Sequence, residues 1–161
     1  MASVDVELEG DWKTVVQHFH KLETFTRLLT ERVAQGIAQQ YFDSLVQHIE
    51  RQDLPLAPLN EWYRAWKEKR GLDTRILIAT GEMLSNIKIY KTQQPGERFI
   101  GIKGGKRHRG GIDMALLALI HEYGTEHPRA AYRLTLQELK KELQTVLNRI
   151  TAEVRVEVFG K

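Results

Sequence analysis

Apolar residues recur at helical spacing over the first third of the chain, from Trp12 onward. Residues three or four apart lie on one face of a helix, so this spacing predicts amphipathic helices. Asp11 is placed to cap the first of them. The polar residues around Thr24 offer a second capping site. This pattern favours a short helix that ends near Lys21 and a long one that ends near Arg51.

Four other segments have the pattern of β-strands. Apolar and charged residues alternate over residues 4–8 and again over residues 154–158, which places all the valines and leucines of each segment on one face. Residues 87–91 and 99–102 flank the turn sequence of residues 93–96, which contains a Pro-Gly pair and predicts a hairpin. The sequence thus predicts about four short antiparallel strands.

The centre of the chain holds an apolar helix predicted over residues 114–123. Its apolar residues cover more than one face, so we expect it to be buried. Gly124 follows the last periodic residue, where a left-handed glycine commonly closes a helix, and Pro128 prevents the helix from resuming in register. A second long amphipathic helix is predicted over residues 130–151.

Shorter elements complete the predicted fold. Asn60 is suited to cap a helix over residues 61–70, and Thr80 begins a capped helical turn. The fold class is therefore α+β, with a small antiparallel sheet of about four strands packed against long amphipathic helices. A length of 161 residues with 42% hydrophobic content indicates a single domain over residues 1–161.

Composition restricts the functional classes only weakly. The chain has no cysteine, so it forms neither disulfides nor thiolate metal sites, which fits a reducing compartment. A net charge of +3 with a pI of about 9.2 permits nucleic-acid binding without indicating it. No apolar run approaches the roughly 20 residues needed to span a bilayer, so no membrane partner is expected.

Residues 103–111 form a basic glycine-rich segment with four glycines and four lysines or arginines. This basic loop has no apolar side chain to bury, so we expect a partner to order it. It lacks the glycine and the hydroxyl residue of a Walker phosphate loop. Non-specific contact with nucleic acid through the loop remains an alternative. The four residues that would make it are Lys103, Lys106, Arg107 and Arg109.

No catalytic or metal-binding pattern is complete. His121 and Glu122 suggest a zinc site, but His127 lies six residues after His121, instead of four on the same helix. His121 and Glu122 either satisfy backbone groups around the turn or lie at a subunit contact. Trp62 and Trp66 lie four apart on one helix face, which is typical of a core and also fits a platform for stacking bases. The sequence predicts no enzymatic activity, no metal and no cofactor.

Two motifs in order resemble a known family. Residues 80–87, Thr-Gly-Glu-Met-Leu-Ser-Asn-Ile, are followed by the hairpin and then by residues 121–125, His-Glu-Tyr-Gly-Thr, with Pro128 and Arg129. This order resembles the minor tail or tail-completion proteins of long-tailed bacteriophages, a virion morphogenesis group with a related head-tail joining group. The resemblance covers about residues 56–135. The family usually has a Pro-Ala-Arg-Pro-Phe run where this chain has residues 128–132.

The resemblance implies a structural virion protein of the neck or tail terminus, assembled in the bacterial host cytoplasm. Such a protein forms a ring, usually six-fold, that completes the tail tube and joins it to the head. Its expected partners are other copies of itself and tail tube, tail terminator or head connector proteins, with DNA passing through without specific binding. The alternative is a non-specific nucleic-acid-binding module that uses the basic loop. The candidate assembly interface comprises Lys103, Lys106, Arg107, Arg109, His121, Glu122 and Arg129.

Overall fold

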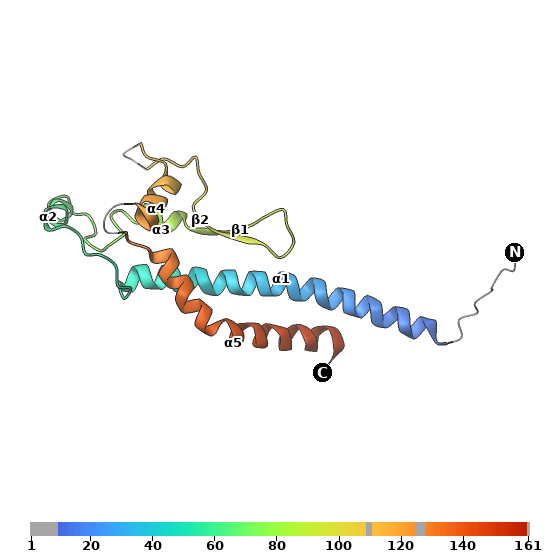
Figure 1. Cartoon of the computed structure of the whole chain (residues 1–161). Coiled ribbons are helices and arrows are strands. Elements are labelled where there is room, and N and C mark those ends of the chain that lie inside the picture. The colour runs from blue at the N-terminus through green and yellow to red at the C-terminus, as the bar shows by residue number, and fades with distance from the viewer. Residues whose placement is uncertain (1–9, 109–110, 125–127, 161) are drawn as a thin grey trace, which may run out of the picture.

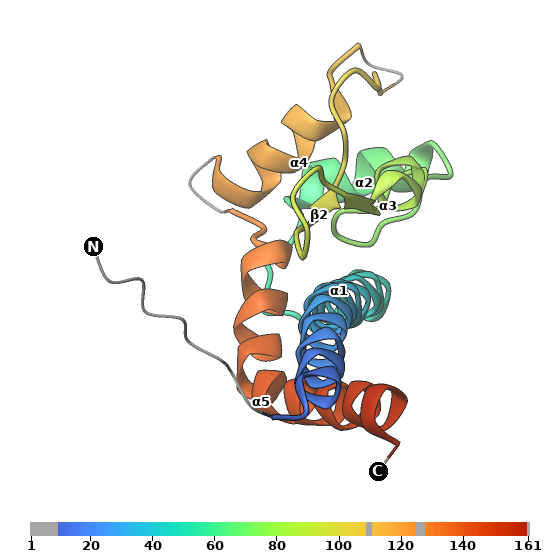
Figure 2. The same ribbon diagram turned by 90° about the vertical axis from the view of Figure 1, so that its right-hand side faces the viewer.

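Two long helices dominate the molecule. The computed structural model describes residues 10–108, 111–124 and 128–160, and it is mostly helical. Helix α1, Trp12–Arg51, runs antiparallel to helix α5, Ala131–Phe159 (Figure 1). The smaller elements are helices α2 (Glu61–Lys69), α3 (Glu82–Asn86) and α4 (Met114–Tyr123) and a two-stranded hairpin. They lie on the side of α1 opposite the carboxyl-terminal end of α5 (Figure 2).

Helix α1 is continuous, so the predicted break after Lys21 is wrong. The hydroxyl of Thr26 donates to the carbonyl of Leu22 at 2.9 Å, and that of Thr30 donates to Thr26 at 2.9 Å. These polar side chains therefore bond within the helix instead of capping a new one. The predicted cap at the start is confirmed, because the Asp11 carboxylate accepts from the Thr14 backbone N–H at 3.2 Å.

The seam between α1 and α5 forms one of two apolar clusters. Val146, Ile150 and Val154 of α5 are buried against the apolar face of α1. The residues of α1 in this contact are Phe25, Leu28, Leu29, Val33 and Ile37. The predicted strand over residues 154–158 is wrong, because these residues continue α5. Val154 lies four residues after Ile150, so the segment also has helical spacing, and α1 covers that face.

The sheet has two strands in the described residues, not four. Strands β1, Lys88–Lys91, and β2, Arg98–Gly101, pair antiparallel with Ile89 opposite Ile100, which confirms the predicted hairpin. The predicted strand over residues 4–8 lies outside the described residues. Arg98 anchors the hairpin on α1, since its Nη2 donates to Glu31 Oε2 at 2.7 Å. This hydrogen bond lowers the pKa of Glu31.

The second apolar cluster lies where the small elements cover the carboxyl-terminal half of α1. Tyr41, Leu45 and Ile49 are buried there with residues from the connecting loops and from α4 and α5. Those residues are Leu54, Ile78, Ile87, Ile102, Met114, Ala131 and Leu139. Helix α2, Glu61–Lys69, is capped as predicted by Asn60, and α3, Glu82–Asn86, forms the predicted short turn of helix.

Candidate functional site

The turn from α4, Met114–Tyr123, into α5 is organised by Glu122. Its carboxylate is buried and accepts from the backbone N–H groups of Tyr132 at 3.1 Å and Arg133 at 2.9 Å. The Arg133 Nε also donates to it at 3.1 Å. The first residue before α5, Ala130, offers no side-chain cap. Glu122 therefore supplies the acceptor and the negative charge that a helix amino terminus needs.

Arg129 and His121 complete the turn with bonds to the backbone. The Arg129 N–H donates to the His121 carbonyl at 2.7 Å, and its guanidinium donates to the carbonyls of Ala57 and Pro58, each at 3.1 Å. Arg129 thereby holds the connector between α1 and α2. Burial lowers the pKa of His121, and the charge of Arg129 lowers it further. The sequence allowed two roles for Glu122, bonding to backbone groups around the turn or lying at a subunit contact. The structure shows the first, since its carboxylate accepts backbone N–H groups.

Gly124 ends α4 in an extended conformation, with φ −89° and ψ 156°, so the predicted left-handed closure is wrong. The glycine is required for a different reason. A Cβ at this position would lie 2.9 Å from the Ile120 carbonyl oxygen. The close approach of the turning chain to α4 therefore selects glycine. His127 lies outside the described residues.

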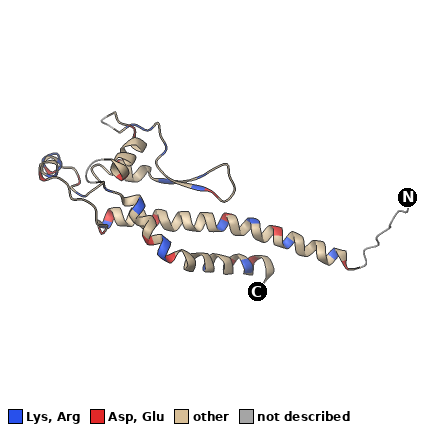
Figure 3. Cartoon of the chain, in the orientation of Figure 1, with Lys and Arg blue, Asp and Glu red and all other residues tan. Residues whose placement is uncertain are grey.

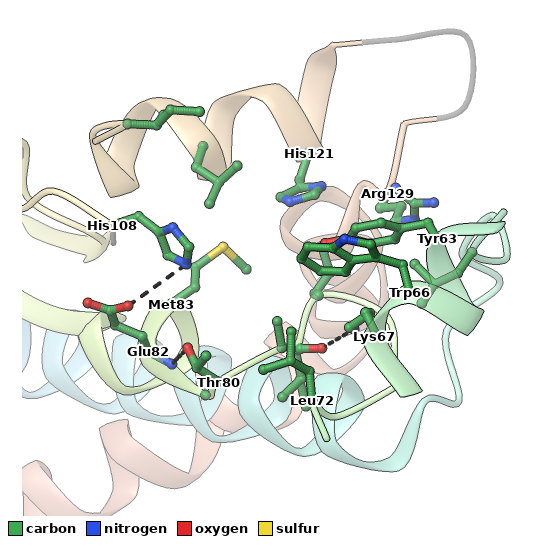
Figure 4. Close-up of a pocket in the computed structure, with 17 residues that line it drawn as sticks. Tyr63, Trp66, Lys67, Leu72, Thr80, Glu82, Met83, His108, His121 and Arg129 are labelled. Carbon is green, nitrogen blue, oxygen red and sulfur yellow. Dashed lines mark hydrogen bonds and ion pairs between the residues drawn. The ribbon is translucent and has the colours of Figure 1, made fainter. Parts of the chain in front are cut away.

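A pocket of about 380 Å³ lies between α2, α3 and α4. Figure 4 shows Tyr63 and Trp66 at one end beside His121 and Arg129, and Glu82 with His108 at the other. The Lys67 ammonium is buried at its edge, donates to the carbonyl of Arg75 at 2.9 Å and also donates to that of Ile78. Burial lowers the pKa of Lys67.

The polar groups around this pocket mainly hold the chain itself together. Lys67 fixes the loop before α3, and Arg129 fixes the connector before α2. The core interpretation of the two tryptophans is wrong for Trp62, which is 72% exposed. Trp66 is half-buried and stacks on Tyr63, with 5.5 Å between ring centroids. The described residues contain no group of three or more His, Cys, Asp or Glu side chains placed to hold a metal.

The basic loop is attached to its own domain by backbone hydrogen bonds. The Gly105 N–H donates to Asp113 Oδ2 at 2.5 Å, and the Met114 N–H donates to the Lys106 carbonyl at 2.8 Å. Asp113 also caps α4, accepting from Ala115 N–H at 2.8 Å. The expectation that a partner alone orders the loop is therefore wrong for its described part. Asp113 was the residue that sequence reasoning missed, although an Asp before an apolar helix is a capping signal.

The basic side chains of the loop lie at different places on the surface. Lys106 Nζ donates to Asn86 Oδ1 at 2.7 Å, and Lys103 Nζ lies 4.4 Å from the centroid of the Tyr90 ring. Arg107 is exposed and pairs through its backbone with Asp113. Arg109 lies outside the described residues. Figure 3 shows acidic and basic residues interspersed along α1 and α5, without a long run of one sign.

In the described part of the chain, exposed apolar side chains gather on two helix faces. The first is on α4 and is here called the α4 face. The predicted burial of this helix is wrong, since only Met114 and Glu122 of α4 are buried. The α4 face consists of Leu116 (52% exposed), Leu119 (55%), Ile120 (39%) and Tyr123 (66%).

The second exposed surface, here called the α1 stripe, lies at the start of α1. It consists of Val15 (38% exposed), Val16 (50%), Phe19 (65%) and Leu22 (52%). The last aromatic residue of α5, Phe159, packs on Phe25 with 5.4 Å between ring centroids. Helix α1 therefore continues beyond the end of α5, and the α1 stripe has no helix against it in the described chain (Figure 1).

Comparisons with known proteins add no relative. No protein-family model matches this chain, and no curated protein or solved structure matches it significantly. In the part of the chain that the structure describes, no helix is long and apolar enough to cross a membrane. The features that bear on function are therefore the exposed surfaces and the two short motifs.

Proposed function

We propose that this protein is a structural subunit of a bacteriophage neck or tail terminus, which forms a ring that completes the tail and joins it to the head. The observation that carries the proposal is the exposure of two separate apolar helix surfaces, the α4 face and the α1 stripe. Large contiguous apolar patches are rare on proteins that function as monomers. A closed ring needs two different surfaces on each copy, which this chain offers.

The family-like motifs support the proposal through the structural roles of their residues. The first motif forms α3 and the entry into the hairpin, with Gly81 left-handed at φ 77°. The second forms the turn in which Glu122 and Arg129 hold α4, α5 and the connector together. Both motifs therefore connect structural elements of the fold, as expected for a structural virion subunit. Its partners would be further copies and tail tube, tail terminator or head connector proteins.

Native mass spectrometry tests the ring. We expect the purified protein, alone or mixed with tail tube or connector proteins, to give a closed oligomer with a single copy number, six by the resemblance. A strict monomer under both conditions would overturn the proposal. Two-dimensional class averages of the assembled neck would then place the ring relative to the head.

The basic loop can be tested separately from the fold. Changing Lys106, Arg107 and Arg109 to serine should leave the thermal midpoint of the isolated subunit almost unchanged. The substitutions keep the hydrogen bonds that involve the backbone of residues 105 and 106 and the carboxylate of Asp113. They remove the hydrogen bond from Lys106 to Asn86, which is exposed and so contributes little to stability. Incorporation into tails should fall, because exposed charges contribute to recognition of an oppositely charged partner.

A matched control for the loop is the pair Lys140→Ser and Lys141→Ser, two exposed positions on α5. This pair should change neither the midpoint nor incorporation. Unfolding of the triple variant several degrees earlier would mean that its side chains stabilise the fold. The nucleic-acid alternative would be favoured if the triple variant assembled normally but lost a salt-dependent affinity for duplex DNA.

A further inference from the structure

The α1 stripe continues a contact surface that the molecule already uses. From Phe25 to Ile37 the apolar side of α1 is covered by α5, and toward the amino terminus the same helical spacing continues through Leu22, Phe19 and Val15. Only the covering helix ends, at Phe159. The uncovered part therefore has the chemistry of a helix–helix seam and lacks the second helix.

The α4 face cannot supply that second helix within one copy. Met114 of α4 belongs to the same buried cluster as Leu45, near the other end of α1. Phe19 precedes Leu45 by a helical length of about 40 Å at 1.5 Å per residue. Both ribbon views place α4 far from the start of α1 (Figures 1 and 2). The two surfaces can meet only between copies.

We propose that the α1 stripe of one copy packs on the α4 face of the next copy, in a head-to-tail contact repeated around a ring. This inference rests on the proposed function and specifies its interface. Each surface offers four apolar side chains over two helical turns, so the lengths match at about 11 Å each. Val15, Val16, Phe19 and Leu22 would lie against Leu116, Leu119, Ile120 and Tyr123.

A two-fold contact between like surfaces fits the exposed residues less well. If two α1 stripes packed together, the α4 faces of both copies would stay in water, and the reverse holds for two α4 faces. A head-to-tail contact removes both surfaces from water at once, and every apolar group buried in this way favours assembly. It is also the type of contact that closes into rings.

The absence of cysteine makes a direct cross-linking test possible. The double variant Val16→Cys with Leu119→Cys, treated with a short bis-maleimide, should give a ladder of linked chains up to the ring number. Each single-cysteine variant should give only unlinked chains. The control Gln17→Cys with Leu119→Cys moves the first thiol about 100° around α1 and should link much less.

The outcomes separate this interface from the proposed function. Rings by native mass without the ladder would overturn the interface and leave the proposed function standing. Linked dimers of Val16→Cys alone, or of Leu119→Cys alone, would show a two-fold contact between like surfaces and overturn it as well. Linking of the double variant that stops at two chains would show a reciprocal two-fold dimer and also overturn it. Monomers by native mass would overturn both.

A charge substitution gives a second readout that needs no cross-link. Phe19→Asp should abolish the ring and leave the unfolding midpoint of the isolated subunit within a few degrees, since Phe19 is 65% exposed. Gln17→Asp, on another side of the same helix, should leave the ring intact. Rings formed by Phe19→Asp at the wild-type concentration would overturn the proposed contact.

Discussion

Replacing Glu122 by alanine is expected to lower the free energy of unfolding by about 2–4 kcal/mol, which is a large effect for one side chain. The carboxylate is buried and accepts the backbone N–H groups of Tyr132 and Arg133, so the substitution leaves both donors without an acceptor. Arg133 would lose its carboxylate partner but keep the hydrogen bond from its Nη2 to the carbonyl of residue 122, now 2.9 Å long. Its side chain is also 48% exposed, so water compensates for part of the loss. Urea unfolding of the isolated subunit measures the effect.

The matched control for Glu122 is Glu153→Ala, an exposed position on α5 that should change stability by no more than about 0.5 kcal/mol. Glu122→Gln should fall between the two, because an amide oxygen still accepts one hydrogen bond but carries no charge for the helix terminus. Equal stability of Glu122→Ala and Glu153→Ala would mean that Glu122 does not hold the start of α5.

Elements with local signals could be predicted from the sequence. Asn60 marks the start of α2, and the Pro-Gly pair at residues 95–96 marks the hairpin turn, because both depend on backbone geometry that only a few residue types provide. Gly96 is favoured locally because its φ is 75°. It is also favoured by a long-range contact, since a Cβ there would collide with the Thr30 side chain of α1.

The exposure of apolar residues could not be predicted in the same way. Helical spacing shows that Leu116 and Leu119 lie on an apolar face, but it does not say whether the covering surface belongs to the same chain. The sequence predicted burial for α4, and the structure leaves that face in water. The predicted burial of Trp62 was wrong for the same reason. Under the proposed function, the α4 face is a place where another copy would complete the core.

The candidate site residues were brought together only in part. His121, Glu122 and Arg129 meet around one turn, as their neighbouring positions suggested, but their polar atoms mainly bond within the chain. Lys103 and Lys106 point to different neighbours, Tyr90 and Asn86, which no local pattern indicates. Long-range contacts of this kind depend on how the loop lies against β1 and α3. The sequence contains no local signal for that arrangement.

The end of α5 gives the second large expected effect. Val154→Asp should lower the free energy of unfolding by about 3 kcal/mol or more, because Val154 is only 2% exposed and a carboxylate there would be buried without a partner. Val156→Asp should cost no more than about 1 kcal/mol, since Val156 is 57% exposed. Both positions lie in the last turns of the helix, so the unfavourable interaction of a new acid with the helix dipole is similar in the two variants.

This pair of variants also distinguishes the helix from the strand that the alternating valines predicted. In a strand, residues 154, 156 and 158 share one face, so the two substitutions would have similar costs. In a helix, residue 156 is turned about 200° from residue 154, away from the α1 seam. Chemical denaturation of the isolated subunits gives both values under one set of conditions. Similar losses would contradict the helical end of α5, and with it the position of Phe159 that leaves the α1 stripe uncovered.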